Sequence, residues 1–327
     1  MSKKNNYSRN VTFDDNALLG ELYGEGNQNL RHIENHAQVT IATKGNVVAI
    51  SGDYDQVRFV QKILESLYAR LMDGLGVGMA EVDAALRMSI DRTPQDGSSE
   101  GGSTGSKLKT FKKIITPRSN TQAEYIDSIY QHQMSFGLGP AGTGKTYLAV
   151  AAGVSLMMAG EVDRLILTRP AVEAGEHLGF LPGDLQEKVD PFLRPIYDAL
   201  HDMMSAEMVV KKFETGEIEV APLAYMRGRT LSNAFIILDE AQNTTPVQMK
   251  MFLTRMGENS KVVVNGDPSQ VDLPKGAWSG LFDAMEVLKG VNEIGFVTFG
   301  HEDVVRHPLV AKIVKAYGSR DKTLKGA

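Results

Sequence analysis

The sequence predicts an α/β fold, with a small α/β domain followed by a larger domain built on a mostly parallel sheet. The composition changes abruptly at residues 93–106, a Gly- and Ser-rich stretch with almost nothing to bury. After this stretch, short apolar runs alternate with helical patterns, as buried parallel strands alternate with their crossover helices. The 327 residues suffice for two domains that each bury a core.

These observations divide the chain into three parts. We expect an N-terminal domain over residues 7–92, a flexible linker over 93–113 and a second domain over 114–327. Basic residues at the end of the linker and just after it are either solvated or in contact with nucleic acid. They are Lys107, Lys109, Lys112, Lys113 and Arg118.

Local patterns predict the elements of both domains. In the first, we expect a helix over 29–35, a hairpin with strands 39–42 and 47–51, and an amphipathic helix over 55–73. In the second, we expect buried strands over 134–138, 165–168, 235–238, 262–265 and 295–299.

Composition excludes several classes of function. The net charge of −5 argues against a wholly basic nucleic-acid binder, although a local basic face remains possible. The absence of cysteine excludes disulfides, Cys-ligated zinc, iron–sulfur clusters and thiol nucleophiles. The first ten residues are polar, and the most apolar stretch, residues 147–159, is too short to span a bilayer. We therefore expect a soluble, cytoplasmic protein that does not enter the membrane.

One motif predicts a phosphate site. Residues 139–146 match G-x-x-x-x-G-K-[ST], between an apolar strand and a helix. Backbone N–H groups of such a loop converge on phosphates, Lys145 reaches the β- and γ-phosphates, and the Thr146 hydroxyl ligates Mg²⁺. The expected phosphate-binding residues are Gly139, Pro140, Ala141, Gly142, Thr143, Gly144, Lys145 and Thr146.

Two further strand ends carry polar residues suited to nucleotide hydrolysis. Asp239 and Glu240 follow a buried strand, where Asp239 is expected to hold Mg²⁺ and Glu240 to polarise the attacking water as a general base. After another strand, Gly266 permits a tight turn that brings Gln270 toward the γ-phosphate or the water.

These motifs resemble those of superfamily 1 helicases. Residues 239–242 are similar to the second helicase motif and residues 266–270 to the third. The resemblance implies that Gln122 reads adenine and that Arg306 contacts the γ-phosphate, a role that suits the fixed charge and planar fork of arginine. The same resemblance indicates Gln242 as a further residue of the site. It further implies a RecA-like core.

A closer resemblance rests on the order of six motifs along residues 114–317. They are the phosphate loop and residues 167–172, 175–183, 239–243, 265–267 and 303–307. In this order they resemble the PhoH family, which is named for induction by phosphate starvation. The resemblance implies an ATP-binding protein, and bacterial relatives of this layout are linked with RNA metabolism and with a YbeY-type endoribonuclease as partner.

The chain has room for one RecA-like core, whereas superfamily 1 helicases use two. We therefore expect a homo-oligomer, as a ring, with Arg227, Arg229 and Arg255 as candidates for an arginine supplied in trans or as structural residues. Arg169 either touches a nucleic-acid backbone or forms an interior salt bridge. Histidines without metal-ligand spacing are interpreted as structural or surface residues: His177, His301 and His307.

The N-terminal domain resembles a KH domain. Residues 23–27 stand where that family has its G-x-x-G loop, which clamps an RNA backbone by close approach of glycines. Here Asn27 replaces the last glycine and Glu25 adds a negative charge, and both changes weaken phosphate contact. The domain either binds RNA through this loop or serves in docking or oligomer formation.

Three functions remain open at this point. The first is a Mg²⁺-dependent ATPase coupled to RNA binding or remodelling, which includes an RNA helicase. The second is a nucleotide-gated adaptor that oligomerises and docks an endoribonuclease. The third is a small-molecule P-loop kinase, which the Asp239–Glu240 pair and Gln270 disfavour.

Overall fold

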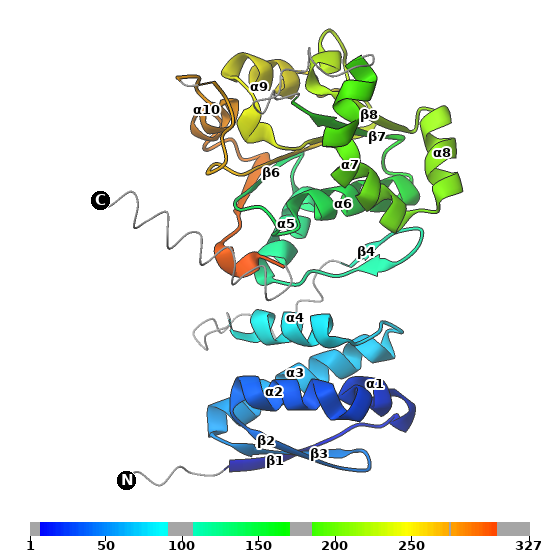
Figure 1. Cartoon of the computed structure of the whole chain (residues 1–327), viewed down its shortest axis with the longest axis vertical. Coiled ribbons are helices and arrows are strands. Elements are labelled where there is room, and N and C mark those ends of the chain that lie inside the picture. Colours follow the sequence, from blue (N-terminus) through cyan, green and yellow to red (C-terminus); the bar gives the residue numbers. More distant parts are fainter. Residues whose placement is uncertain (1–6, 91–106, 171–184, 275, 306–327) are drawn as a thin grey trace. The chain divides into compact units, whose positions relative to one another are not determined.

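The structure is a computed structural model that describes residues 7–90, 107–170, 185–274 and 276–305. The described chain divides into two compact units, the first made of residues 7–90 with 118–120 and the second of the other described residues from 107 to 305. Each unit is described by itself below (Figure 1).

The first unit is a three-stranded antiparallel sheet, in the order β1-β3-β2, with helices formed by the intervening and following segments. The expected helix, hairpin and long amphipathic helix are all present, whereas the first strand and the last helix were not predicted. The elements are β1 (Tyr7–Thr12), α1 (Leu19–Tyr23), α2 (Gln28–Ala37), β2 (Thr40–Lys44), β3 (Val47–Gly52), α3 (Tyr54–Met72) and α4 (Met79–Ile90).

Helix α3 supplies much of the core of this unit. It begins at an N-cap, Asp53, whose side chain accepts a hydrogen bond from the backbone N–H of Asp55 and so satisfies one of the free donors of the first turn. Its apolar residues recur every three or four positions, so they share one face of the helix and bury it against the sheet. The buried residues are Val57, Val60, Ile63, Leu64, Leu67 and Leu71.

The second unit contains a six-stranded, wholly parallel sheet in the order β11-β6-β10-β9-β7-β8. The predicted α/β class and the mostly parallel sheet of the larger domain are therefore confirmed. Its elements are β4 (Leu108–Lys109), β5 (Ile114–Ile115), α5 (Asn120–Gln131), β6 (Met134–Leu138), α6 (Lys145–Ala159), β7 (Arg164–Arg169), α7 (Leu185–Met203), α8 (Ala206–Glu214), β8 (Ile218–Pro222), β9 (Ala234–Leu238), α9 (Pro246–Leu253), β10 (Lys261–Gly266), α10 (Gly280–Val287) and β11 (Ile294–Thr298).

All five strands predicted for this sheet are present, and a sixth, β8, was missed. Strand β8 lies at the edge of the sheet, next to β7. It is less apolar than the central strands, with Glu219 in its middle and Pro222 at its end. An edge strand needs no continuous apolar run, and it tolerates proline because one side has no hydrogen-bond partner.

Alternate residues of each central strand serve two separate cores, because successive side chains of a strand point to opposite faces. Leu165, Phe235 and Val263 pack with helices α5, α6 and α7 on one face. Ile236 and Val264 pack with α9 and α10 on the other face. Figure 1 shows the sheet between these helical layers.

Helix α6 is buried around most of its circumference, and one glycine sets how closely it approaches the sheet. A Cβ placed on Gly153 would lie 2.6 Å from Leu165 Cδ1 and 2.7 Å from Phe235 Cδ1, so no other residue fits without displacing the strand side chains. Close packing at this point holds the helix that begins at the phosphate loop firmly against strands β7 and β9.

The predicted linker extended to Lys113, but its basic end is folded. Leu108 is fully buried in the core of the second unit, and β4 pairs with β5. Within the hairpin between these strands, Lys112 donates to two backbone carbonyls at the end of α7: its backbone N–H to Met203 and its Nζ to His201. Lys113 pairs with Asp202. Residues 107–113, predicted as the end of the flexible linker, are therefore held in the second unit by a buried leucine and by contacts with the last residues of α7.

Candidate active site

The phosphate motif forms a loop between the carboxyl end of β6 and the start of α6. Gly139, Gly142 and Gly144 all have positive φ angles, which glycine adopts without strain. A Cβ on Gly139 would lie 2.4 Å from the carbonyl oxygen of Phe299, so that position also requires glycine for space. The N-terminal end of the 15-residue helix α6 directs its free N–H groups into the loop, as an anion site requires.

Lys145 is held inside this loop. Its Nζ donates to the carbonyl oxygens of Gly139 (2.7 Å) and Pro140 (2.8 Å), and it is 3.2 Å from Thr143 Oγ1. Burial lowers the pKa of Lys145, while the charges of Asp267, Asp239 and Glu240 act in the opposite direction. A buried cation satisfied mainly by neutral carbonyls is suited to exchange these partners for phosphate oxygens.

Thr146 and Asp239, the two expected metal ligands, are in direct contact. The Thr146 hydroxyl donates to Asp239 Oδ1 at 2.7 Å, although strand β10 lies between β6 and β9 in the sheet. Burial raises the pKa of Asp239, and the charge of Arg169 opposes that effect. A hydroxyl and a buried carboxylate at hydrogen-bond distance are oxygen donors of the kind that Mg²⁺ prefers, and its charge would compensate the burial of Asp239. The residues therefore fit a Mg²⁺ ion.

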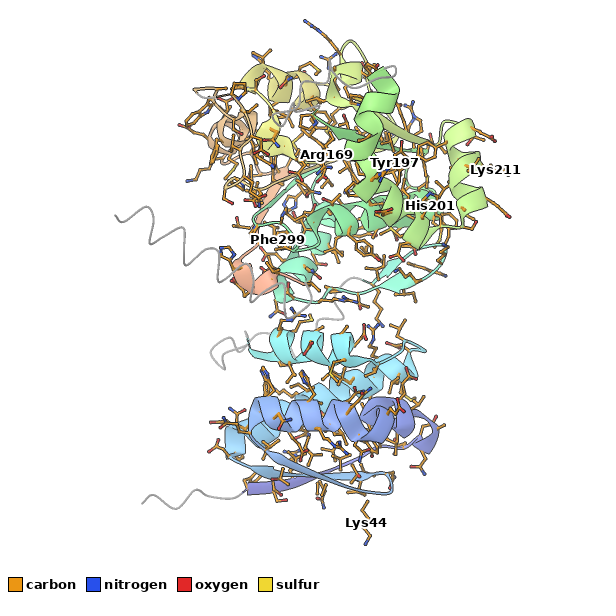
Figure 2. The ribbon with its side chains drawn as sticks, in the orientation of Figure 1. Lys44, Arg169, Tyr197, His201, Lys211 and Phe299 are labelled. Carbon is orange, nitrogen blue, oxygen red and sulfur yellow. The ribbon has the colours of Figure 1, made fainter. Side chains whose placement is uncertain are left out.

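Glu240 follows Asp239 with a left-handed backbone conformation, at φ 53°. Both of its carboxylate oxygens accept hydrogen bonds: Oε1 from Arg169 Nη2 at 2.5 Å and Oε2 from Gln242 Nε2 at 2.5 Å. Arg169 Nε also lies 3.7 Å from Asp239 Oδ2. Of the two roles considered for Arg169, whose place in the second unit Figure 2 labels, the contacts thus show the interior salt bridge.

Gln242 joins Glu240 to the loop after β10. Its Oε1 accepts a hydrogen bond from the backbone N–H of Asp267 at 3.0 Å. The Asp267 carboxylate accepts hydrogen bonds from Ser269 and, at 2.6 Å, from Gln270 Nε2. A continuous chain of polar contacts therefore runs from the end of β7 through Glu240 to Gln270.

A cavity of about 580 Å³ opens over the phosphate loop. Eight of the predicted site residues line it and so meet in one place: Ala141, Gly142, Gly144, Lys145, Thr146, Asp239, Glu240 and Gln270. Tyr147 and residues of α7 also line it, and sequence reasoning missed them because the residue spacing in this part of the chain defines no catalytic set. The additional lining residues from α7 are Pro195, Asp198, Ala199 and Asp202.

For two further predicted nucleotide contacts, the structure shows no position at this cavity within the described residues. Gln122 is buried, and its Nε2 donates to the Thr143 carbonyl at 2.9 Å. It is not among the described residues that line the cavity. Its role in reading adenine remains a prediction. Arg306 lies outside the described residues, which end at Val305, whose N–H donates to the Gly142 carbonyl at 2.9 Å.

The three arginines considered for a trans role differ in their contacts. Arg229 forms a paired contact with Glu219, at 2.6 and 2.7 Å. Arg255 donates to the carbonyl oxygens of Met251 and Arg229. Arg227 is exposed. His301 is exposed as expected, whereas His177 and His307 lie outside the described residues.

In the first unit, the expected glycine loop lies between α1 and α2, as predicted. Gly24, Gly26 and Asn27 all have positive φ angles, so the Asn27 that replaces glycine still adopts the left-handed conformation. Glu25 is exposed. The resemblance to an RNA-clamping loop remains a prediction.

Comparison with known proteins agrees with this geometry. The sequence model of the family described as PhoH-like protein matches residues 114–318, which include the phosphate loop, Asp239, Glu240 and Gln270. The chain belongs to the PhoH-like family. The match covers the predicted second domain, in keeping with the family resemblance of its motifs.

Several relatives are similar over most of the chain. A PhoH-like protein of Bacillus subtilis is 48% identical over 307 residues, which cover 94% of this chain and 95% of that protein. A PhoH-like protein of Synechocystis is 45% identical and covers 92% of each chain. Protein PhoH of Escherichia coli is 48% identical over 205 residues, 62% of this chain and 58% of that protein.

Among solved structures, the PhoH-like chain has low similarity to two helicases. The Pif1 helicase of Candida albicans is 16% identical with a TM-score of 0.30, over 57% of this chain and 40% of that one. The Hef helicase domain of Pyrococcus furiosus is 15% identical with a TM-score of 0.31, over 56% and 38%. No helix within the described residues has the length and apolarity needed to cross a membrane.

Proposed function

We propose that this PhoH-like protein is a Mg²⁺-dependent ATPase whose turnover is coupled to RNA. The observation that carries the proposal is the position of Glu240, which lines the same cavity as Lys145 and directly follows the buried metal-ligand candidate Asp239. A second carboxylate beside the metal ligand serves hydrolysis, because it can orient a water molecule and accept its proton. Nucleotide binding alone does not require it.

Each residue of the cavity has a role in this reaction. The loop N–H groups and Lys145 bind the phosphates, and Thr146 and Asp239 hold Mg²⁺. Bound Mg²⁺ supplies positive charge to the phosphate oxygens as negative charge develops on the leaving group. Glu240 orients the water and accepts its proton, while Gln270 is placed to sense the γ-phosphate. Arg306 is expected to add a further positive charge.

Coupling to RNA is supported by two features. The glycine loop of the first unit has the left-handed backbone that allows close approach to a phosphodiester. Arg169, at the end of β7, has a guanidinium that binds phosphate as well as carboxylate. The single parallel-sheet core in the described part of the chain further supports a homo-oligomer, in which Arg227 is the trans candidate with an exposed side chain.

The first test is steady-state ATP hydrolysis with and without poly(U) RNA, beside a Glu240→Gln variant. We expect Mg²⁺-dependent turnover that RNA stimulates several-fold and that the variant lacks, although the variant still binds ATP. A variant with wild-type turnover would refute the role of Glu240. Turnover that does not respond to RNA would favour the adaptor function, in which ATP controls oligomerisation and the docking of an endoribonuclease.

A further inference from the structure

Arg169 and Glu240 form a short ion pair in the chain of polar contacts at the cavity. Arg169 Nη2 lies 2.5 Å from Glu240 Oε1, and the side chains are 17% and 40% exposed. The second Glu240 oxygen is held by Gln242, 2.5 Å away. The carboxylate expected to act as base therefore has a cation on one oxygen and an amide donor on the other.

These two contacts restrain Glu240 in a state unsuited to proton abstraction. Both Glu240 oxygens accept hydrogen bonds, so the two donors fix the orientation of the carboxylate and occupy the oxygens that would otherwise accept a hydrogen bond from water. Hydrolysis requires a carboxylate turned toward a water molecule near the γ-phosphate. These two hydrogen bonds must therefore be broken or rearranged before Glu240 can orient the water.

We propose that Arg169 is a positioning residue that restrains Glu240 and that an RNA phosphodiester releases it by competing for the guanidinium. This inference rests on the proposed ATPase function. Phosphate and carboxylate oxygens match the same arginine fork, so one can replace the other. The exchange replaces one charge-assisted hydrogen bond of the guanidinium by another, and water can solvate the Glu240 oxygen that it releases, because that side chain is 40% exposed.

The same exchange of partners at Arg169 also affects the loop after β10, which carries Asp267 and Gln270. Gln242 bonds to Glu240 through its amide nitrogen and to the Asp267 N–H through its oxygen. Asp267 in turn binds Gln270. Movement of Glu240 away from Arg169 therefore changes the contacts of Gln242 and, through Asp267, those of Gln270. One binding event at the end of β7 acts on both the base and the sensor.

The test compares Arg169→Ala with wild type by steady-state ATP hydrolysis, with and without poly(U) RNA. We expect Arg169→Ala to raise kcat several-fold in the absence of RNA, to leave KM for ATP within about two-fold, and to abolish stimulation by RNA. Arg169→Lys keeps the charge and should restore both slow basal turnover and a response to RNA. Arg164→Ala removes an arginine from the other end of β7, where it donates to the Ser232 carbonyl, and should behave as wild type.

Two results would overturn the inference. One is an Arg169→Ala protein that binds ATP but turns over more slowly than wild type, because Arg169 would then support the reaction. The other is full RNA stimulation of Arg169→Ala. If Arg169→Ala does not fold, Arg169→Gln takes its place with the same expectations. Failure of the proposed function is distinct, because it shows in the wild type alone, as absence of ATP hydrolysis or of its stimulation by RNA.

Discussion

The Thr146 hydroxyl donates a hydrogen bond to Asp239 Oδ1 at 2.7 Å, although the two residues are 93 positions apart in the sequence. The hydrogen bond joins the start of α6 to the end of β9, although β10 lies between β6 and β9 in the sheet. It brings together the two oxygen donors that a magnesium ion bound to nucleotide requires.

We expect Thr146→Ala to weaken ATP binding in the presence of Mg²⁺ by about ten-fold or more, equivalent to at least 1.4 kcal/mol. In EDTA the variant and wild type should bind alike, because the hydroxyl acts through the metal. Isothermal titration calorimetry with and without Mg²⁺ measures both values. Thr146→Ser keeps the hydroxyl and is the matched control. Equal loss of affinity with and without Mg²⁺ would exclude a role in metal binding.

Gln242→Ala should reduce both stability and turnover. The substitution leaves the buried backbone N–H of Asp267 without its acceptor, at a cost of about 1–3 kcal/mol. It also removes the link from Glu240 to the Gln270 loop, so kcat should fall more than ATP affinity. Chemical denaturation and steady-state kinetics measure the two effects. Gln270→Ala, at an exposed position, should lower kcat without the loss of stability. Unchanged stability in Gln242→Ala would contradict the contact.

Gly153→Ala should destabilise the second unit by about 1–3 kcal/mol, because overpacking at the sheet exceeds the gain in helix propensity. The added Cβ would lie 2.6 Å from Leu165 Cδ1. Urea denaturation of the full chain measures the change. Ala159→Ser, at an exposed position near the end of the same helix, serves as control and should have little effect. A stabilised Gly153→Ala would mean that α6 is packed less closely than described.

Glu25→Lys should strengthen RNA binding several-fold at constant salt. The exposed Glu25 repels phosphates in the glycine loop, and lysine at this position would attract them. Fluorescence anisotropy with labelled single-stranded RNA measures the affinity. Asp14→Lys makes the same change of charge at an exposed position outside the loop. If both variants gain affinity equally, the effect comes from net charge and the loop has no special role.

The sequence was sufficient for the parts of the fold that local patterns encode. Strand β6 was predicted to the residue, and the phosphate loop was placed at its end, because a buried strand followed by glycines and an apolar helix is a local pattern. Strand β8 was missed since its burial depends on its neighbour β7 and not on its own composition. Leu108 was assigned to a linker because one buried leucine among lysines gives no periodic pattern.

The sequence predicted which residues form the site better than it predicted the contacts between them. Lys145, Asp239 and Glu240 follow from motif chemistry, and the structure brings them to one cavity. The pairing of Arg169 with Glu240 depends on β7 and β9 being neighbours in the sheet, which residue spacing does not show. The carboxylates of α7 reach the cavity only through the packing of that helix on α6.

The order of strands in the parallel sheet has a consequence for biosynthesis. The core of the first unit is complete within residues 11–86, so this unit can fold while the ribosome is still translating the second. The cavity cannot form then, because its wall includes Gln270 and its central strand β10 ends at Gly266. A nascent chain therefore carries a folded first unit well before it can bind a nucleotide. A chain truncated before β10 lacks part of the cavity wall and so cannot bind a nucleotide there.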